Sequence, residues 1–130
     1  MSWQAAALVA LGGALGSVLR YAVTVLADAR WGPGFPWGTL LVNVAGSFVI
    51  GVVAELAAGR GVLSPATRIF IATGICGGFT TFSSYSLDAL TLARDGAATP
   101  ALLYVAGSVV LGLVAVYLGV AAARAITLPA

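Results

Sequence analysis

The sequence contains no histidine and no lysine, and its only cysteine is Cys76. Without histidine, neither a catalytic imidazole nor a histidine-ligated metal is available, and a single cysteine excludes a disulfide within the chain. The acidic residues stand singly, which argues against a metal site built from several carboxylates of one chain. They are Asp28, Glu55, Asp88 and Asp95. We therefore do not expect an enzyme.

Charge of either sign is scarce. Charged residues make up 8% of the 130 residues and hydrophobic residues 61%, and the mean hydropathy is +1.08. A soluble domain carries roughly 25% charged residues, so this chain cannot cover itself with a water-facing surface. We expect an integral membrane protein of one domain, residues 1–130. The net charge of +2 is small and dispersed, so nucleic acid is not an expected partner.

Four apolar stretches are long enough to cross a membrane, which takes about 20 mostly apolar residues. We expect helices at about 3–26, 37–58, 68–93 and 101–123, separated by loops rich in glycine and proline. No basic run precedes the first stretch, so we interpret it as a membrane helix and not as a cleaved signal. The predicted fold class is all-α, with several membrane crossings.

The arginines give almost no preference for one orientation. Four crossings put both termini on one side with three arginines, and the opposite side carries two or three. They are Arg60, Arg68 and Arg124 on the first side, and Arg30, Arg94 and, if its side chain extends there, Arg20 on the second. Basic asymmetry normally sets orientation. Either another feature orients the chain, or the chain inserts both ways and pairs antiparallel with itself.

Small residues recur four positions apart in every predicted helix. The pairs are Gly12 with Gly16, Ser47 with Gly51, Gly74 with Gly78, and Ser108 with Gly112. This spacing lets helices approach closely in lipid, so we expect close packing.

Polar side chains inside the predicted helices are few, and each has a structural and a functional interpretation. Asn43 either makes an interhelical hydrogen bond or offers an amide donor to a passing ion. Asp88 either extends to the membrane surface or lies in a vestibule. Arg20 and Glu55 stand near helix ends, where such side chains extend to the interface. Arg20 could also concentrate anions at a pore mouth.

The stretch "GGFTTFSSYS", residues 77–86, is the most polar part of the third predicted helix. Gly77 and Gly78 cost a helix about 2 kcal/mol relative to two alanines, and the hydroxyls that follow can satisfy freed backbone groups. The pattern predicts either a simple kink or a break near the bilayer centre. A break would expose carbonyls that suit a cation and amides that suit an anion.

Aromatic side chains recur every three residues in the same stretch, at Phe79, Phe82 and Tyr85. Serine hydroxyls stand beside them at Ser83, Ser84 and Ser86. The rings either pack in the ordinary way or turn their positive edges toward an anion. No lysine or arginine accompanies them, and a fixed cation would hold an anion too tightly for fast passage. The pattern favours an anion path over an anion store.

Motifs along nearly the whole chain resemble the Fluc (CrcB) family of fluoride channels. "GGALGSVLRY" resembles the first-helix motif, "WGTLLVNVAGSFVIG" the second and "TGICGGFTTFSSYSLD" the third-helix signature, and Tyr104 with Ser108 fits the fourth. The resemblance implies four membrane helices with the third broken, assembled as an antiparallel, dual-topology homodimer. It implies two pores through which fluoride leaves a prokaryotic cell across the cytoplasmic (inner) membrane. It also implies a structural sodium ion on the two-fold axis.

The resemblance carries roles over to individual positions. It implies sodium-binding backbone carbonyls at Gly77 and Thr80, and a pore amide at Asn43. It implies an aromatic box of Phe82 and Tyr85. The remaining implied positions form a hydroxyl track at Ser83 and Ser84, with Ser86 less secure, a path or vestibule lining of Thr39, Asp88, Tyr104 and Ser108, and a pore mouth at Arg20.

Two positions depart from the family pattern. Tyr85 stands where Phe is usual, and its hydroxyl could bond a neighbour and turn the ring. Asp88 stands where Glu is common and is one methylene shorter.

Two other functions remain as alternatives. A dual-topology exporter of lipophilic cations has a similar size, but it needs a carboxylate within the membrane; the first helix has none, and Asp88 is off-centre. A non-transporting assembly subunit would leave Asn43 and the clustered hydroxyls without a role.

Overall fold

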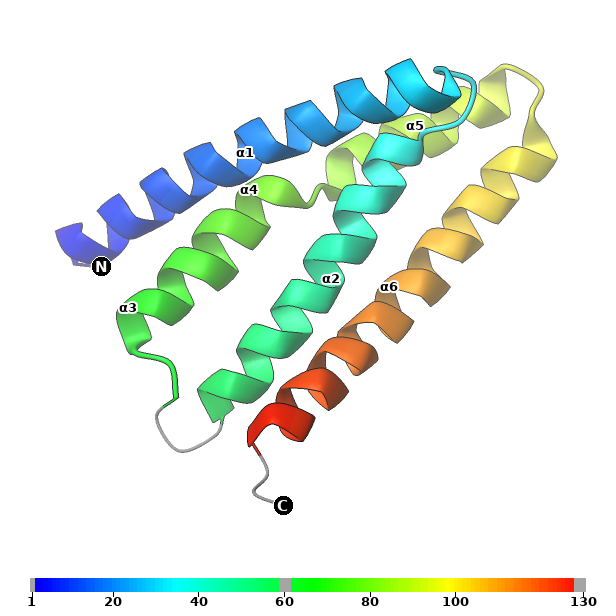
Figure 1. Ribbon diagram of the computed structural model, residues 1–130. Helices are drawn as coiled ribbons and strands as arrows, with labels where there is room; N and C mark the ends of the chain where they lie inside the picture. Colours follow the sequence, from blue (N-terminus) through cyan, green and yellow to red (C-terminus); the bar gives the residue numbers. More distant parts are fainter. Residues whose placement is uncertain (1, 59–61, 128–130) are drawn as a thin grey trace.

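The structure is a computed structural model that describes residues 2–58 and 62–127, and over these residues it contains helices and no strand (Figure 1). The expected all-α class is confirmed. The elements are α1 (Trp3–Trp31), α2 (Trp37–Ala58), α3 (Pro65–Arg68), the π-helix η1 (Ile69–Cys76), α4 (Gly77–Phe79), α5 (Phe82–Arg94) and α6 (Ala98–Thr127). Three of them, α1, α2 and α6, are long and apolar enough to cross a membrane.

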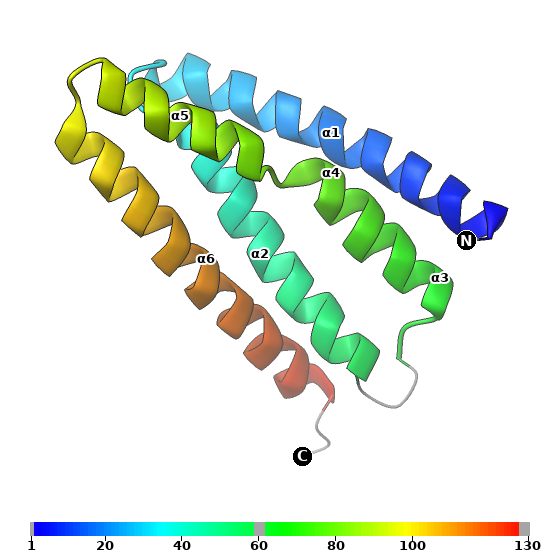
Figure 2. The same cartoon turned by 180° about the vertical axis from the view of Figure 1, so that it is seen from behind.

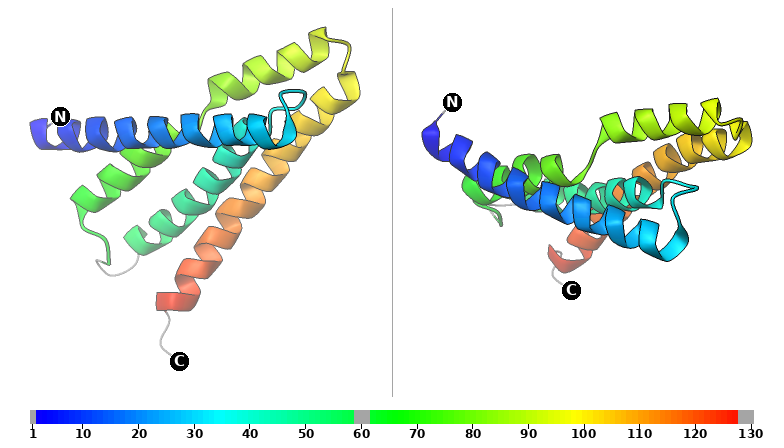
Figure 3. Two further views of the ribbon diagram at one scale, coloured as in Figure 1. Left: turned by 45° about the horizontal axis from the view of Figure 1, so that its top comes forward. Right: turned by 90° about the horizontal axis from the view of Figure 1, so that it is seen from above.

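The helices alternate in direction along the chain. Figure 2 shows the α1–α2 and α5–α6 links at one end of the molecule, while both chain termini lie away from them. Figure 3 shows α2 and α6 running side by side, with α1 crossing them at an angle. α3, η1 and α4 follow one another directly; η1 and α4 pack along α1, and α5 continues beyond them against α6.

Two of the long helices extend past their expected ends. α1 continues through Trp31 instead of ending near residue 26, because the polar segment after it remains helical until Gly32. Gly32 has φ +79°, and its N–H donates to the Asp28 carbonyl at 2.9 Å, which ends the helix. α6 begins at Ala98 and ends at Thr127, beyond 101–123. Pro100 lies in its first turn, where a missing N–H breaks no helical bond.

Glycines bring the membrane helices together backbone to backbone. A Cβ at Gly12 of α1 would lie 2.6 Å from the Phe70 carbonyl oxygen and 2.9 Å from the Gly74 Cα. A Cβ at Gly119 of α6 would lie 3.0 Å from the Val52 nitrogen of α2. No side chain fits at these crossings, so the close packing expected from small-residue spacing is confirmed there. A Cβ at Gly112 would meet only the Ser47 hydroxyl at 3.5 Å, which is an ordinary contact.

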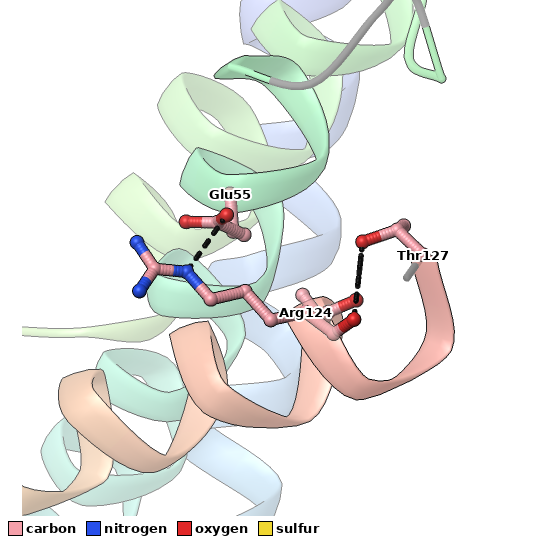
Figure 4. A network of polar contacts seen from close by, with 4 residues as sticks. Glu55, Arg124 and Thr127 are labelled. Atoms are coloured by element: carbon pink, nitrogen blue, oxygen red, sulfur yellow. Dashed lines mark hydrogen bonds and ion pairs between the residues drawn. The ribbon is translucent and has the colours of Figure 1, made fainter. Parts of the chain in front are cut away.

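An ion pair joins the ends of α2 and α6. Figure 4 shows Arg124 extending toward Glu55, with 2.9 Å between Nε and Oε1. Thr127 donates its hydroxyl to the Ala123 carbonyl at 3.0 Å in the last turn of α6. The Glu55 carboxylate is thus partnered where it emerges at the helix end.

Large apolar side chains cover the outside of the molecule. Tyr117 is 72% exposed, Leu102 69% and Leu113 67%, all on α6. A soluble protein rarely exposes so continuous an apolar surface. The exposed faces therefore agree with a membrane protein whose helices meet lipid or another protein chain.

Candidate functional site

The chain is extended for two residues between α4 and α5. Thr80 has φ −81° and ψ 160°, and Thr81 has φ −155° and ψ 120°. The Thr80 N–H and hydroxyl both donate to the Cys76 carbonyl at 2.9 Å, which closes the end of α4. Thr81 is the N-cap of α5, because its Oγ1 accepts the Ser84 N–H at 3.1 Å. The two threonines thus complete the helix ends on either side of the extended residues.

Asn43 of α2 binds the extended backbone with both ends of its amide. The Thr81 N–H donates to Oδ1 at 2.7 Å, and Nδ2 donates to the Thr81 carbonyl at 3.0 Å. The side chain therefore gives the Thr81 N–H the acceptor that a continuous helix would supply, and adds a second donor to the Thr81 carbonyl, which as the N-cap carbonyl also accepts the first bond of α5. Of the two interpretations of Asn43, structural and functional, the structure shows the structural one, a hydrogen bond between segments of the chain. One of the two Nδ2 hydrogens stays outside this pair.

The same bonds change the partners of two carbonyls. In an uninterrupted helix the Gly77 carbonyl would accept from the N–H of Thr81, and the Thr80 carbonyl from the N–H of Ser84. Here the Thr81 N–H goes to Asn43 and the Ser84 N–H to the Thr81 hydroxyl. The carbonyls of Gly77 and Thr80 are thus deprived of their helical donors. A Cβ at Gly77 would meet nothing within 4 Å, so this backbone is open to approach.

A cavity of about 430 Å³ lies beside the extended residues. Its hydrogen-bonding side chains come from α2, the extended residues and α6, and two aromatic rings from α5 complete it. The lining is Asn43, Gly46, Ser47, Ile50, Ala72, Cys76, Gly77, Thr80, Thr81, Phe82, Tyr85, Ser108 and Val109. None of these described lining residues is charged. Six of the expected site residues meet here: Asn43, Gly77, Thr80, Phe82, Tyr85 and Ser108.

Ser108 brings an unsatisfied hydroxyl to this cavity. Its Oγ is buried and has no hydrogen-bond partner within the described part of the chain. Buried polar atoms in folded proteins nearly always have a partner, and leaving one unmet costs about 1–3 kcal/mol. The hydroxyl thus has no partner beside the cavity, and a change of its side-chain rotamer would be needed to bring it to an occupant.

The aromatic residues of α5 form a short series that continues onto α6. The rings of Phe82 and Tyr85 have centroids 5.5 Å apart at an interplanar angle of 38°, and Phe82 is 80% exposed. The Tyr85 and Tyr104 rings are 5.4 Å apart at 43°. The Tyr85 hydroxyl donates to the Val105 carbonyl at 3.3 Å. The hydroxyl that departs from the family pattern therefore ties this ring to α6.

A second polar cluster lies next to these rings and outside the cavity lining. Tyr104 is 1% exposed, and its hydroxyl donates to Asp88 Oδ2 at 3.2 Å. Thr39 of α2 is 8% exposed and lies beside the same hydroxyl. Three expected site residues thus meet each other, one each from α2, α5 and α6.

The remaining expected site residues lie apart from the cavity. Ser83 and Ser84 occupy the first turn of α5, with their hydroxyls 3.2 and 3.1 Å from Thr81 Oγ1. Ser86 returns its hydroxyl to the Phe82 carbonyl of its own helix at 2.9 Å. Arg20 is on α1, where its carbonyl accepts the Thr24 hydroxyl at 3.0 Å.

Thr81 is a residue of the candidate site that the sequence analysis did not single out. It receives both bonds of Asn43, caps α5 and contacts both serines of the first turn. The available signal was a threonine directly before a helical segment, the preferred N-cap position.

Residues 7–120 match the sequence family described as "CrcB-like protein, Camphor Resistance (CrcB)". The chain belongs to the CrcB family. A relative from Chlorobium luteolum is 54% identical over 117 residues, which cover 90% of each chain. One from Rhizobium meliloti is 52% identical over 118 residues, 91% of this chain and 94% of the relative. One from Rhizobium etli is 56% identical over 119 residues, 92% and 95%.

All three relatives carry the name "Fluoride-specific ion channel FluC". The family is thus one of ion channels and not of enzymes. The match spans α1 to α6, so it includes both extended residues, the cavity and the Tyr104 cluster of this CrcB-family chain.

Proposed function

We propose that this chain is a fluoride-selective channel that lets fluoride leave a prokaryotic cell passively across the cytoplasmic membrane. Membership of a family whose relatives are named as fluoride channels supports the ion. The observation that carries the proposal is the uncharged cavity at the extended residues, with the unpaired Ser108 hydroxyl beside it. Such donors can form hydrogen bonds with a small anion that replace those it gives up when it leaves water.

The donors in the cavity are weak and several, which suits passage. The Ser108 hydroxyl, the second Nδ2 hydrogen of Asn43 and the ring edges of Phe82 and Tyr85 would contact fluoride in turn. No fixed cation among the lining residues would hold the ion. Ser83 and Ser84 extend the hydroxyl track along α5.

Further groups would act where the ion enters or leaves. Thr39, Tyr104 and Asp88 form the vestibule in this proposal, and Arg20 concentrates anions at the mouth. Asp88 bonds to Tyr104 and stands outside the cavity lining, so it offers no support for a cation exporter, which needs an exchange carboxylate on the path.

The assembly in this proposal is an antiparallel homodimer of four-crossing chains. Residues 65–94 form the third crossing, which is interrupted at Thr80 and Thr81 and so falls short of a continuous apolar helix. Phe82 is 80% exposed in the single chain, which a partner chain at this face would cover. The even distribution of arginine supports insertion in both orientations. Two-fold symmetry then gives two identical pores.

A sodium ion at the centre of that dimer is the proposed structural cofactor. The carbonyls of Gly77 and Thr80 lack their helical donors, and hard cations prefer such oxygens. The oxygens of two chains related by a two-fold axis would complete the shell. Sodium there would balance the partial negative charge of these carbonyl oxygens and would hold together the interrupted helices of the two chains.

Liposomes loaded with fluoride test the channel directly. Purified protein should release fluoride when an ionophore relieves the charge imbalance, and matched liposomes loaded with chloride should retain it. Equal release of chloride, or no release of either ion, would overturn the proposed function.

A further inference from the structure

Phe35 connects a loop to the second polar cluster across a long stretch of sequence. It lies between α1 and α2, yet its ring centroid is 5.6 Å from that of Tyr104 on α6, edge-on at 86°. Phe35 also packs against the buried group of Leu92, Ala101 and Tyr104. Edge-to-face contact at this separation is the preferred arrangement of two aromatic rings.

The Tyr104 ring is held between two other rings. Phe35 contacts it at 86° and Tyr85 at 43°, with centroid distances of 5.6 and 5.4 Å. A tyrosine side chain has two torsions, so the position of its hydroxyl follows from that of the ring. The 3.2 Å hydrogen bond from Tyr104 to Asp88 therefore depends on both neighbours.

The loop presents Phe35 in a fixed position. The Trp37 N–H donates to the Phe35 carbonyl at 2.8 Å, and the two rings are 4.6 Å apart. Trp31, at the end of α1, contacts Trp37 with a centroid distance of 6.0 Å. The ring of Phe35 is thus supported from the loop side while its other side meets Tyr104.

We propose that Phe35 is a positioning residue of the channel: it holds Tyr104 so that the Tyr104 hydroxyl keeps the Asp88 carboxylate in the vestibule and out of the uncharged cavity. Asp88 is the one acidic residue of α5. A carboxylate released from Tyr104 would be free to turn toward the cavity, where its charge would repel fluoride strongly because little water screens it. This inference rests on the proposed function for its effect on transport, but the contact with Tyr104 can be tested separately.

Fluoride efflux from liposomes is the first measurement. Phe35→Ala opens space beside Tyr104, and an aromatic pair is worth about a 2- to 12-fold change in an equilibrium constant, so efflux should fall by about that factor. Phe35→Leu keeps apolar volume but loses the ring edge and should slow efflux as well. Phe35→Tyr keeps the ring and should run near the wild-type rate. The matched control is Trp3→Ala, which removes a ring that is 90% exposed at the start of α1 and lies outside this series.

The second measurement reports on Tyr104 directly. The protein is labelled with tyrosine carrying ¹³C at Cζ, whose chemical shift follows the hydrogen bond of the hydroxyl, and Tyr104→Phe identifies the signal among the four tyrosines. Phe35→Ala and Phe35→Leu should shift this signal, and Trp3→Ala should not. If fluoride efflux falls in the Phe35 variants while the Tyr104 signal is unchanged, Phe35 does not act by positioning Tyr104.

A double substitution isolates the charge. In an Asp88→Asn background the carboxylate is gone, so Phe35→Ala should no longer slow efflux. An equal loss in both backgrounds would overturn the role assigned to Asp88. If the wild-type protein releases no fluoride, the proposed function fails, whereas the Tyr104 signal still decides whether Phe35 holds that ring.

Discussion

Replacing Asn43 by alanine removes both hydrogen bonds that hold Thr81 in its extended conformation. Thr81 is 8% exposed, so little water reaches its N–H in this position. The Thr81 carbonyl, at the N-cap of α5, keeps its donor from the first turn of that helix, so the N–H alone loses its only partner. A buried backbone group left without a partner costs about 1–3 kcal/mol, and the extended conformation is destabilised by about that amount.

The Thr81 N–H has one nearby alternative. Its helical acceptor would be the Gly77 carbonyl, so α4 would continue through residues 80 and 81. That change would remove the extended residues that border the cavity and give the Gly77 carbonyl a partner. Fluoride efflux should therefore fall at least about tenfold, which corresponds to about 1.4 kcal/mol.

Efflux from liposomes and amide hydrogen exchange at Thr81 together test this prediction. Ser47→Ala is the matched control, since Ser47 lines the same cavity one turn further along α2 without bonding Thr81. The variant should elute at the same volume as the wild-type protein, which is that of the proposed dimer, because the lost bonds lie within one chain. Wild-type efflux combined with unchanged exchange at Thr81 in Asn43→Ala would refute the reasoning.

Three further substitutions test other parts of the site and the fold. Phe82→Ala should slow fluoride efflux without dissociating the dimer, and an unchanged rate would remove this ring from the path. Tyr85→Phe loses one long hydrogen bond to Val105, worth about 1 kcal/mol, so the temperature of thermal unfolding should shift by a few degrees at most. Fluoride efflux should change, because the ring is no longer tied to α6. Unaltered efflux would mean that the hydroxyl does not determine the orientation of the ring. Gly12→Val should lower the yield of folded protein, because its Cβ would lie 2.6 Å from the carbonyl oxygen of a neighbouring helix. Gly107→Ala, whose Cβ would have nothing within 4 Å, should be tolerated. Equal yields of the two variants would contradict the close backbone contact at Gly12.

Local sequence signals predicted those features that depend on local chemistry. Pro36 and Trp37 mark the start of α2, and the helix ends at Ala58, directly before a glycine. Glycine spacing predicted the crossings at Gly12 and Gly74, because only residues without a side chain allow two backbones to touch. The composition of residues 77–86 pointed to the segment where the extended residues lie.

Contacts between distant residues could not be predicted in the same way. Asn43 and Thr81 are 38 positions apart, and neither residue type specifies the other. The contact of Phe35 with Tyr104 depends on how a loop folds back onto α5 and α6, which hydropathy does not encode. The end of α1 was misjudged because a polar segment stayed helical until Gly32 ended it. The π-helical form of η1 has no compositional signal that we can identify.

The glycine crossings have a consequence for motion. Conformational switching in proteins generally uses side chains that can repack in two discrete ways. Backbone contacts backbone directly at two crossings, Gly12 with Gly74 and Gly119 with Val52. No side chain lies there that could change rotamer and allow a second arrangement of the two helices. Sliding one helix past the other would drive Cα atoms against carbonyls. A pore built on this scaffold would therefore not open and close by sliding of these two helix pairs, and any gate would have to come from the side chains of its lining.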